Sequence, residues 1–79
     1  MNNKEKYVEA FKSTFMVEES QLGALKYQDI SAWDSVGHMA LMAALEDAFE
    51  IELDIDEIIE FSGFEFGKTI LAKYDVVIE

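Results

Sequence analysis

The sequence contains no cysteine and no proline, and it has only four glycines among its 79 residues. Without cysteine the chain can form no disulfide, no thiolate metal site and no catalytic thiol. Because proline and glycine are the residues that most often interrupt helices, their scarcity favours a helical fold. A chain of this length predicts a single domain over residues 1–79, and its 51% of hydrophobic residues can supply a core.

Basic residues are also scarce, since 6 Lys and Arg residues stand against 17 Asp and Glu residues and give a net charge of −11. Such a surface repels the phosphates of nucleic acids and of anionic membranes, so we expect no nucleic-acid partner and no membrane partner. It favours a protein partner with a basic patch, reached by electrostatic steering. No apolar run approaches the roughly 18 residues of a spanning helix, and the first residues are polar. We therefore expect a cytoplasmic protein, and a monomer.

Apolar periodicity predicts two long helices. Tyr7, Phe11 and Phe15 recur every four residues and predict a helix over about residues 4–15. The clearest helix is predicted over about residues 35–49, where large apolar residues are interspersed with alanine, the strongest helix former.

The rest of the chain predicts loops and two further helices. Residues 17–34 break the helical period, and irregularly spaced apolar residues can anchor this long loop on a core. The alternating acidic and apolar run 50–56 has the period of a strand, but no second strand exists to pair with it, so we predict an extended loop. A short helix over about 56–61 and a last helix over about 66–74 follow, and the tail 75–79 is either strand-like or frayed. These elements predict an all-α fold: a small antiparallel four-helix bundle with three main helices, one short helix and a long first loop.

The stretch 33–39, Trp-Asp-Ser-Val-Gly-His-Met, opens the second long helix. Asp34 and Ser35 are both common helix caps. The capping box is missing, because His38 and not Glu or Gln stands three residues after Ser35. A serine here presents its hydroxyl outward, near free backbone N–H groups and the positive end of the helix dipole, which suits an anion. Two interpretations are compatible: a cap at Asp34 and a modified hydroxyl at Ser35.

Asp34-Ser35-Val36 resembles the Asp-Ser-Leu motif of acyl carrier proteins and of the related peptidyl carriers. The leucines, acidic residues and phenylalanine that follow over 41–53 are also similar to that family, and the resemblance covers roughly residues 5–73. It implies that Ser35 is esterified by 4'-phosphopantetheine from coenzyme A. The chain would then carry acyl groups as thioesters in fatty acid, polyketide or specialised acyl metabolism, without being an enzyme and without catalytic residues or a metal.

The resemblance also implies partners: a phosphopantetheinyl transferase, and acyl-loading and acyl-processing enzymes with basic docking patches. In that family the second helix and the following loop dock the partners, and the run 46–60 of this chain has eight carboxylates and no basic residue. The ordinary interpretation of such a run is a solvated face. Carried over position by position, the resemblance gives these contact candidates: Asp34, Val36, Glu46, Asp47 and Asp56.

Two departures from the family bear on the pathway. Carriers of primary fatty acid synthesis usually have an acidic residue where this chain has Ala40, and often a methionine where it has Ala43. The segment 61–66 is also more aromatic than usual, and exposed aromatics can mark a binding surface. These departures favour a specialised carrier serving a dedicated pathway.

Two other functions stay open. An aminoacyl or peptidyl carrier of a nonribosomal pathway would have the same fold and arm. An unmodified acidic adaptor protein would use the bundle for binding alone, with Ser35 as a cap. A hydrolase is disfavoured, because His38 has no third triad partner and no Gly-x-Ser-x-Gly elbow surrounds the serine, so we expect this histidine to be exposed.

Two minor features need an interpretation. Asp54-x-Asp56 hints at calcium but lacks the further ligands and the central glycine of an EF-hand loop. Met39 and Met42 belong either to the core or to an adaptable acyl cavity, and we favour the core.

Overall fold

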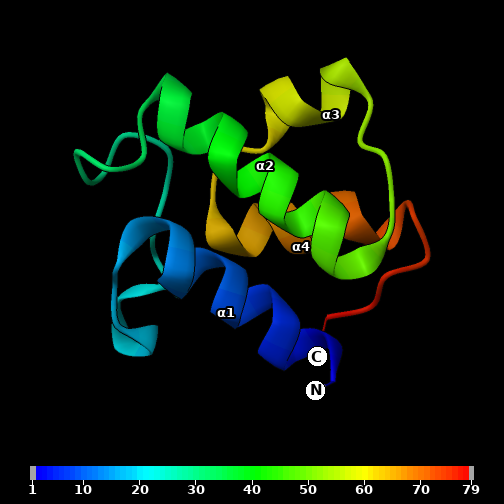
Figure 1. The fold of residues 1–79 in the computed structure, drawn as a ribbon, viewed down its shortest axis with the longest axis horizontal. Coiled ribbons are helices and arrows are strands. Elements are labelled where there is room, and N and C mark those ends of the chain that lie inside the picture. Colours follow the sequence, from blue (N-terminus) through cyan, green and yellow to red (C-terminus); the bar gives the residue numbers. More distant parts are fainter. Residues whose placement is uncertain (1, 79) are drawn as a thin grey trace.

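The computed structural model describes residues 2–78 and contains four α-helices and one short 3-10 turn. The elements are α1 (Asn3–Phe15), η1 (Glu19–Gln21), α2 (Ser35–Phe49), α3 (Ile55–Glu60) and α4 (Phe64–Ala72). Figure 1 shows α1 and α2 running in opposite directions, with α3 on the side of α2 away from α1. The predicted all-α fold of four helices with a long first loop is confirmed. No helix within residues 2–78 is long and apolar enough to span a membrane.

The helix ends follow their capping residues. Asn2 accepts from the N–H of Glu5 at 2.8 Å while the Glu5 carboxylate accepts from the N–H of Asn2, which makes a capping box at the start of α1. Met16 after α1 and Glu50 after α2 both adopt left-handed conformations, which end these helices. The predicted bounds of α1 and α2 are confirmed to within one residue.

The last helix begins and ends two residues earlier than predicted. Phe64 is already helical because the Gly63 carbonyl accepts from the N–H of Gly67 at 2.9 Å. The helix ends at Ala72, and Asp75 then turns the chain with a positive φ of 63°. Turn geometry of this kind leaves no periodic signal in the sequence, so hydrophobic spacing alone misplaced both ends.

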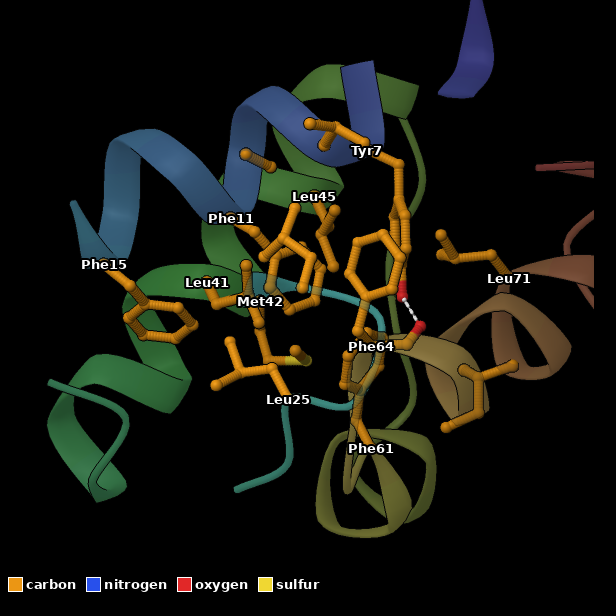
Figure 2. Close-up of a cluster of buried hydrophobic side chains, with 14 of the residues drawn as sticks. Tyr7, Phe11, Phe15, Leu25, Leu41, Met42, Leu45, Phe61, Phe64 and Leu71 are labelled. Atoms are coloured by element: carbon orange, nitrogen blue, oxygen red, sulfur yellow. Dashed lines mark hydrogen bonds between the residues drawn. The ribbon is translucent and has the colours of Figure 1, made fainter. Parts of the chain in front are cut away.

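The core is built around the ring of Phe11. This ring packs against five other aromatic rings, with centroids 5.0–6.3 Å away, which come from α1, the long loop and the α3–α4 region: Tyr7, Phe15, Trp33, Phe61 and Phe64. Figure 2 shows the labelled aromatic side chains of this cluster converging with leucines of α2 and α4. The predicted apolar stripe of the first helix is therefore the centre of the core.

Tyr7 supplies a polar contact inside this core. Its hydroxyl donates to the carbonyl of Phe64 at 2.6 Å, drawn as the dashed line in Figure 2. Burial raises the pKa of the Tyr7 hydroxyl, and the nearby Glu65 carboxylate adds to the rise, so the phenol keeps its proton and remains a donor. The bond ties the start of α1 to the start of α4.

The long loop is pinned at three buried residues, Leu22, Leu25 and Trp33. Its backbone also joins the segment before α4, because Tyr27 N–H donates to the carbonyl of Ser62 at 2.9 Å. Of the five apolar residues expected to anchor this loop, the three buried ones are confirmed, whereas Tyr27 is 36% exposed and Ile30 is only partly buried.

The two remaining segments have no regular structure. Residues 51–54 connect α2 to α3 without strand pairing, as predicted, and Leu53 is buried there. In the tail, Val76 is buried and the Val77 carbonyl accepts from the side chain of Asn3 at 3.2 Å. The described part of the tail is therefore neither a strand nor frayed, because it is held against α1.

The prediction that the aromatic segment 61–66 is an exposed surface is wrong for two of its three rings. Phe61 is 1% exposed and Phe64 is 6% exposed, because both pack on Phe11. Only Phe66, at 47%, faces solvent.

Gly67 tests this aromatic packing. A Cβ at this position would overlap the ring of Phe61 and the hydroxyl of Tyr7. We expect Gly67→Ala to lower the free energy of unfolding by about 1–3 kcal/mol, because the overlap outweighs the better helix propensity of alanine. Urea denaturation measures this. Gly23→Ala is the control, since an added Cβ there meets nothing within 4 Å, and an equal loss in both variants would contradict the packing.

Candidate functional site

Ser35 is the first residue of α2, and its side chain is exposed. The cap is made by Asp34, whose carboxylate accepts from the N–H of Gly37 at 2.8 Å. The Asp34 carbonyl accepts from the N–H of His38 at 2.7 Å. Asp34 is therefore the residue that caps α2. This cap does not use the Ser35 hydroxyl. Of the first-turn N–H groups, those of Ser35 and Val36 remain for another acceptor.

Gly37 fixes the position of this helix start. A Cβ on Gly37 would overlap the carbonyl oxygen of Ala32, so only glycine lets the first turn lie this close to the loop before it. The ring of Phe15 lies on the same side, 3.3 Å from that Cβ position. The close neighbour of Gly37 is thus the chain's own loop, and Ser35 is held at a defined place on the surface.

An apolar groove opens beside Ser35, between α2, α3 and the long loop. Its volume is about 370 Å³, and it is lined by Tyr27, Ser35, His38, Met39, Ile58, Ile59, Phe61 and Ser62. Met39 is 53% exposed and lines the groove, whereas Met42 is 1% exposed and belongs to the core. The preference for a core position is confirmed for Met42 and wrong for Met39.

The expectation that His38 is exposed is wrong. The imidazole is half-buried and uses both ring nitrogens: Trp33 Nε1–H donates to Nδ1 at 2.9 Å, and Nε2 lies 2.7 Å from the carbonyl oxygen of Ile58. Neither nitrogen is left to accept a proton from Ser35, so the arrangement offers no serine–histidine pair. The sequence offered one sign of this hydrogen-bonding role of His38: the chain's single tryptophan stands five residues before its single histidine. An analysis of helical periodicity does not detect such a pair.

Four large apolar side chains around this site are exposed, and we call them the apolar patch: Val36, Met39, Ile55 and Ile59, exposed by 77%, 53%, 74% and 74%. Val36 was a predicted contact residue. Ile55 and Ile59 were missed, because α3 is too short for periodicity to separate an exposed face from a buried one. The groove and the apolar patch share Met39 and Ile59.

The predicted contact residues divide into two groups. Asp34 and Val36 flank Ser35, whereas Glu46 and Asp47 lie near the other end of α2, about 17 Å away at 1.5 Å per residue. Asp56 is exposed in the first turn of α3. The structure therefore brings Asp34, Ser35 and Val36 together, leaves Glu46 and Asp47 apart from them, and places Asp56 on α3.

Glu46 has a structural partner that the sequence did not reveal. Its carboxylate accepts from the backbone N–H of Leu53 at 2.8 Å, which holds the connection between α2 and α3. Asp47, the next residue, is exposed. A carboxylate at a helix C-terminus opposes the dipole, and for Glu46 this loop contact is the compensating interaction.

No group of three or more His, Asp or Glu side chains within residues 2–78 could hold a metal ion, and the pair Asp54 and Asp56 gains no third ligand there. Comparisons of the chain with protein-family models, with curated proteins and with solved structures found no match. The function must therefore be argued from the site itself.

The matched pair Glu46 and Asp47 tests the loop contact. We expect Glu46→Ala to lower the free energy of unfolding by about 1–3 kcal/mol, because the N–H of Leu53 loses a charged acceptor. Asp47→Ala removes the same charge from the same helix end without breaking that bond, so its effect should stay within about 0.5 kcal/mol. Thermal or urea denaturation of both variants decides, and equal effects would mean that the contact contributes nothing.

Proposed function

We propose that this chain is an acyl carrier protein whose Ser35 bears 4'-phosphopantetheine and which presents acyl thioesters to partner enzymes. The observation that carries the proposal is the exposed Ser35 hydroxyl at the start of α2, capped by Asp34 and bordered by an apolar groove. The resemblance of Asp34-Ser35-Val36 to the carrier motif supports it. In this proposal the chain is a carrier and not an enzyme.

The residues at Ser35 fit such a group. Attachment forms a P–O bond at the serine oxygen, releases adenosine 3',5'-bisphosphate from coenzyme A and passes the serine proton to a base of the transferase. The phosphodiester is an anion, and the N–H groups of Ser35 and Val36 lie at the positive end of the 15-residue helix α2. When bound, the group supplies the thiol that holds an acyl chain as a thioester, which the chain itself lacks because it has no cysteine.

The groove favours acyl cargo over aminoacyl cargo. Its lining includes no carboxylate that could pair with an ammonium group, and Met39, Ile58 and Ile59 give it an apolar wall. Burying apolar cargo there is worth about 25 cal/mol per Å² removed from water. An aminoacyl or peptidyl carrier remains the alternative that the identity of the loading enzyme would decide.

The proposed partners are a phosphopantetheinyl transferase and acyl-loading and acyl-processing enzymes with basic patches. The apolar patch lies beside Ser35, and Asp56 and Glu60 of α3 are exposed near it. A partner with an apolar centre and a basic rim matches this surface in both respects. Exposed Ala40 and Ala43 leave the middle of α2 small and uncharged, which supports a specialised pathway. A cytoplasmic location and a monomeric state belong to the same proposal.

The first test is intact mass. We expect the protein to gain the mass of one phosphopantetheine when it is incubated with coenzyme A, Mg²⁺ and a broad-specificity phosphopantetheinyl transferase. Ser35→Ala should gain nothing, because the accepting oxygen is gone. Ser62→Ala is the matched control: this exposed serine lines the same groove and should leave the gain unchanged.

No gain in folded wild-type protein that carries no arm beforehand would reject the carrier and favour the acidic adaptor. A gain that persists in Ser35→Ala would place the modification elsewhere.

A second test concerns docking. We expect Val36→Glu to lower kcat/KM for the transferase reaction about tenfold, because a carboxylate would replace an apolar contact beside the reacting hydroxyl. Val77→Glu is the control, since Val77 is also exposed, at 59%, but lies in the C-terminal tail. Circular dichroism should show both variants folded, and an equal loss of rate in the two would assign the effect to total charge instead of to the apolar patch.

A further inference from the structure

The chain has one tryptophan and one histidine, and the two are hydrogen-bonded to each other. An indole N–H can only donate, so Nδ1 of His38 must be the acceptor of the bond from Trp33. A carbonyl oxygen can only accept, so Nε2 must carry the hydrogen that points to Ile58. Both bonds form together in a single protonation state, the neutral imidazole with its hydrogen on Nε2.

This imidazole connects three parts of the fold. Trp33 is fully buried, stacks on Phe15 of α1 at 5.0 Å and lies 5.6 Å from Phe11, so the indole cannot follow a moving ring. His38 belongs to α2, and the Ile58 carbonyl belongs to α3. The imidazole thus bonds α3 to the aromatic core through the start of α2.

The rest of α3 is held weakly. None of its residues is fully buried, and Ile58 packs only partly against the core. Its ion pair joins Glu57 to Lys73, the residue after α4, at 3.2 Å, and the Lys73 side chain is 58% exposed, so water screens the pair. The bond from His38 is therefore a principal polar contact between α3 and the rest of the fold.

We propose that His38 is a proton-operated latch that holds α3 beside α2 when neutral and releases it when protonated. A proton on Nδ1 would set two N–H donors, those of Trp33 and His38, face to face at 2.9 Å with no acceptor between them. The buried indole cannot turn away, so the imidazole must move, and its bond to Ile58 is lost with it. The latch is therefore closed while the imidazole is neutral and opens when a falling pH adds a proton to the ring.

The groups around the ring come from the long loop, from the start of α2 and from α3. From the long loop the phenol ring of Tyr27 packs against the imidazole at 5.3 Å, and Trp33 is neutral. From the end of α3 come the ring of Phe61 and the Ile58 carbonyl. The carboxyl groups on the two elements that the ring joins include Asp34 of the α2 cap and Asp56, Glu57 and Glu60 of α3. Among these side-chain types, imidazole is the one whose charge ordinarily changes between pH 5 and 8.

The latch bears on the groove beside Ser35. Ile58 and Ile59 form one wall of that groove, so release of α3 widens it. That this would alter how cargo is sheltered rests on the proposed carrier function. The latch itself does not, and its test uses the unmodified protein, so either idea can fail while the other stands.

The test is amide hydrogen exchange on the unmodified protein at pH 7.5 and pH 5.5, corrected for intrinsic rates. We expect protection of α3 amides, such as the Ile58 N–H that donates to Asp54, to fall about tenfold at the lower pH while α1 amides keep theirs. In His38→Gln, which has a donor and an acceptor but binds no proton in this range, the fall should be absent. Unchanged α3 protection in the wild type, or the same fall in His38→Gln, would overturn the latch.

A second measurement needs no variant. Nitrogen-15 NMR of the single imidazole at pH 7.5 should show the hydrogen on Nε2, with Nδ1 as acceptor. The opposite tautomer would contradict the bond from Trp33, and the proposal with it.

Discussion

The packing of aromatic rings around Phe11 is the interaction on which the rest of the structure depends. A 79-residue domain without disulfides or proline buries little surface per residue, and this one must also hold together against a net charge of −11. Aromatic side chains bury the most area for each residue ordered. Rings from α1, from the long loop and from both sides of the α3–α4 junction all meet Phe11, so a single cluster organises segments far apart in the chain.

The candidate site is an extension of that cluster. Trp33 belongs to the core through Phe15 and to the site through its bond to His38. The loop that ends at Trp33 also presses on Gly37, which sets where α2 begins and hence where Ser35 stands. Packing in the core therefore decides the position of an exposed hydroxyl that makes no core contact of its own. The Ser35 hydroxyl on the surface gains its fixed position in this indirect way.

Much of this fold could be predicted from the sequence, and the exceptions share a cause. The helical stripes of α1 and the alanine-rich α2 gave signals over three or four turns, and both were placed to within a residue. The start of α4 and the burial of Phe61 and Phe64 depend on distant segments, because the Phe64 N–H donates to the Leu25 carbonyl and both rings pack on Phe11. The bond of Glu46 to Leu53 depends on how the loop after α2 turns back onto the helix. Single-sequence periodicity carries no information on such contacts. Ser35 was found from its local sequence pattern, whereas the groove beside it could be found only once α3 was placed. The chemical role of Ser35 stays a prediction.

The acidic surface and the apolar patch make physical sense only together. Val36, Met39, Ile55 and Ile59 are exposed in a chain small enough for such a patch to promote self-association. Two copies meeting through this patch would also bring two strongly negative surfaces into contact, and that repulsion opposes the dimer. A basic partner is attracted instead, because the carboxylates that repel a second copy of the chain draw a basic protein toward the apolar patch. In the proposed carrier, the excess of carboxylates would select among partners while leaving the patch available, which stability alone does not require of them.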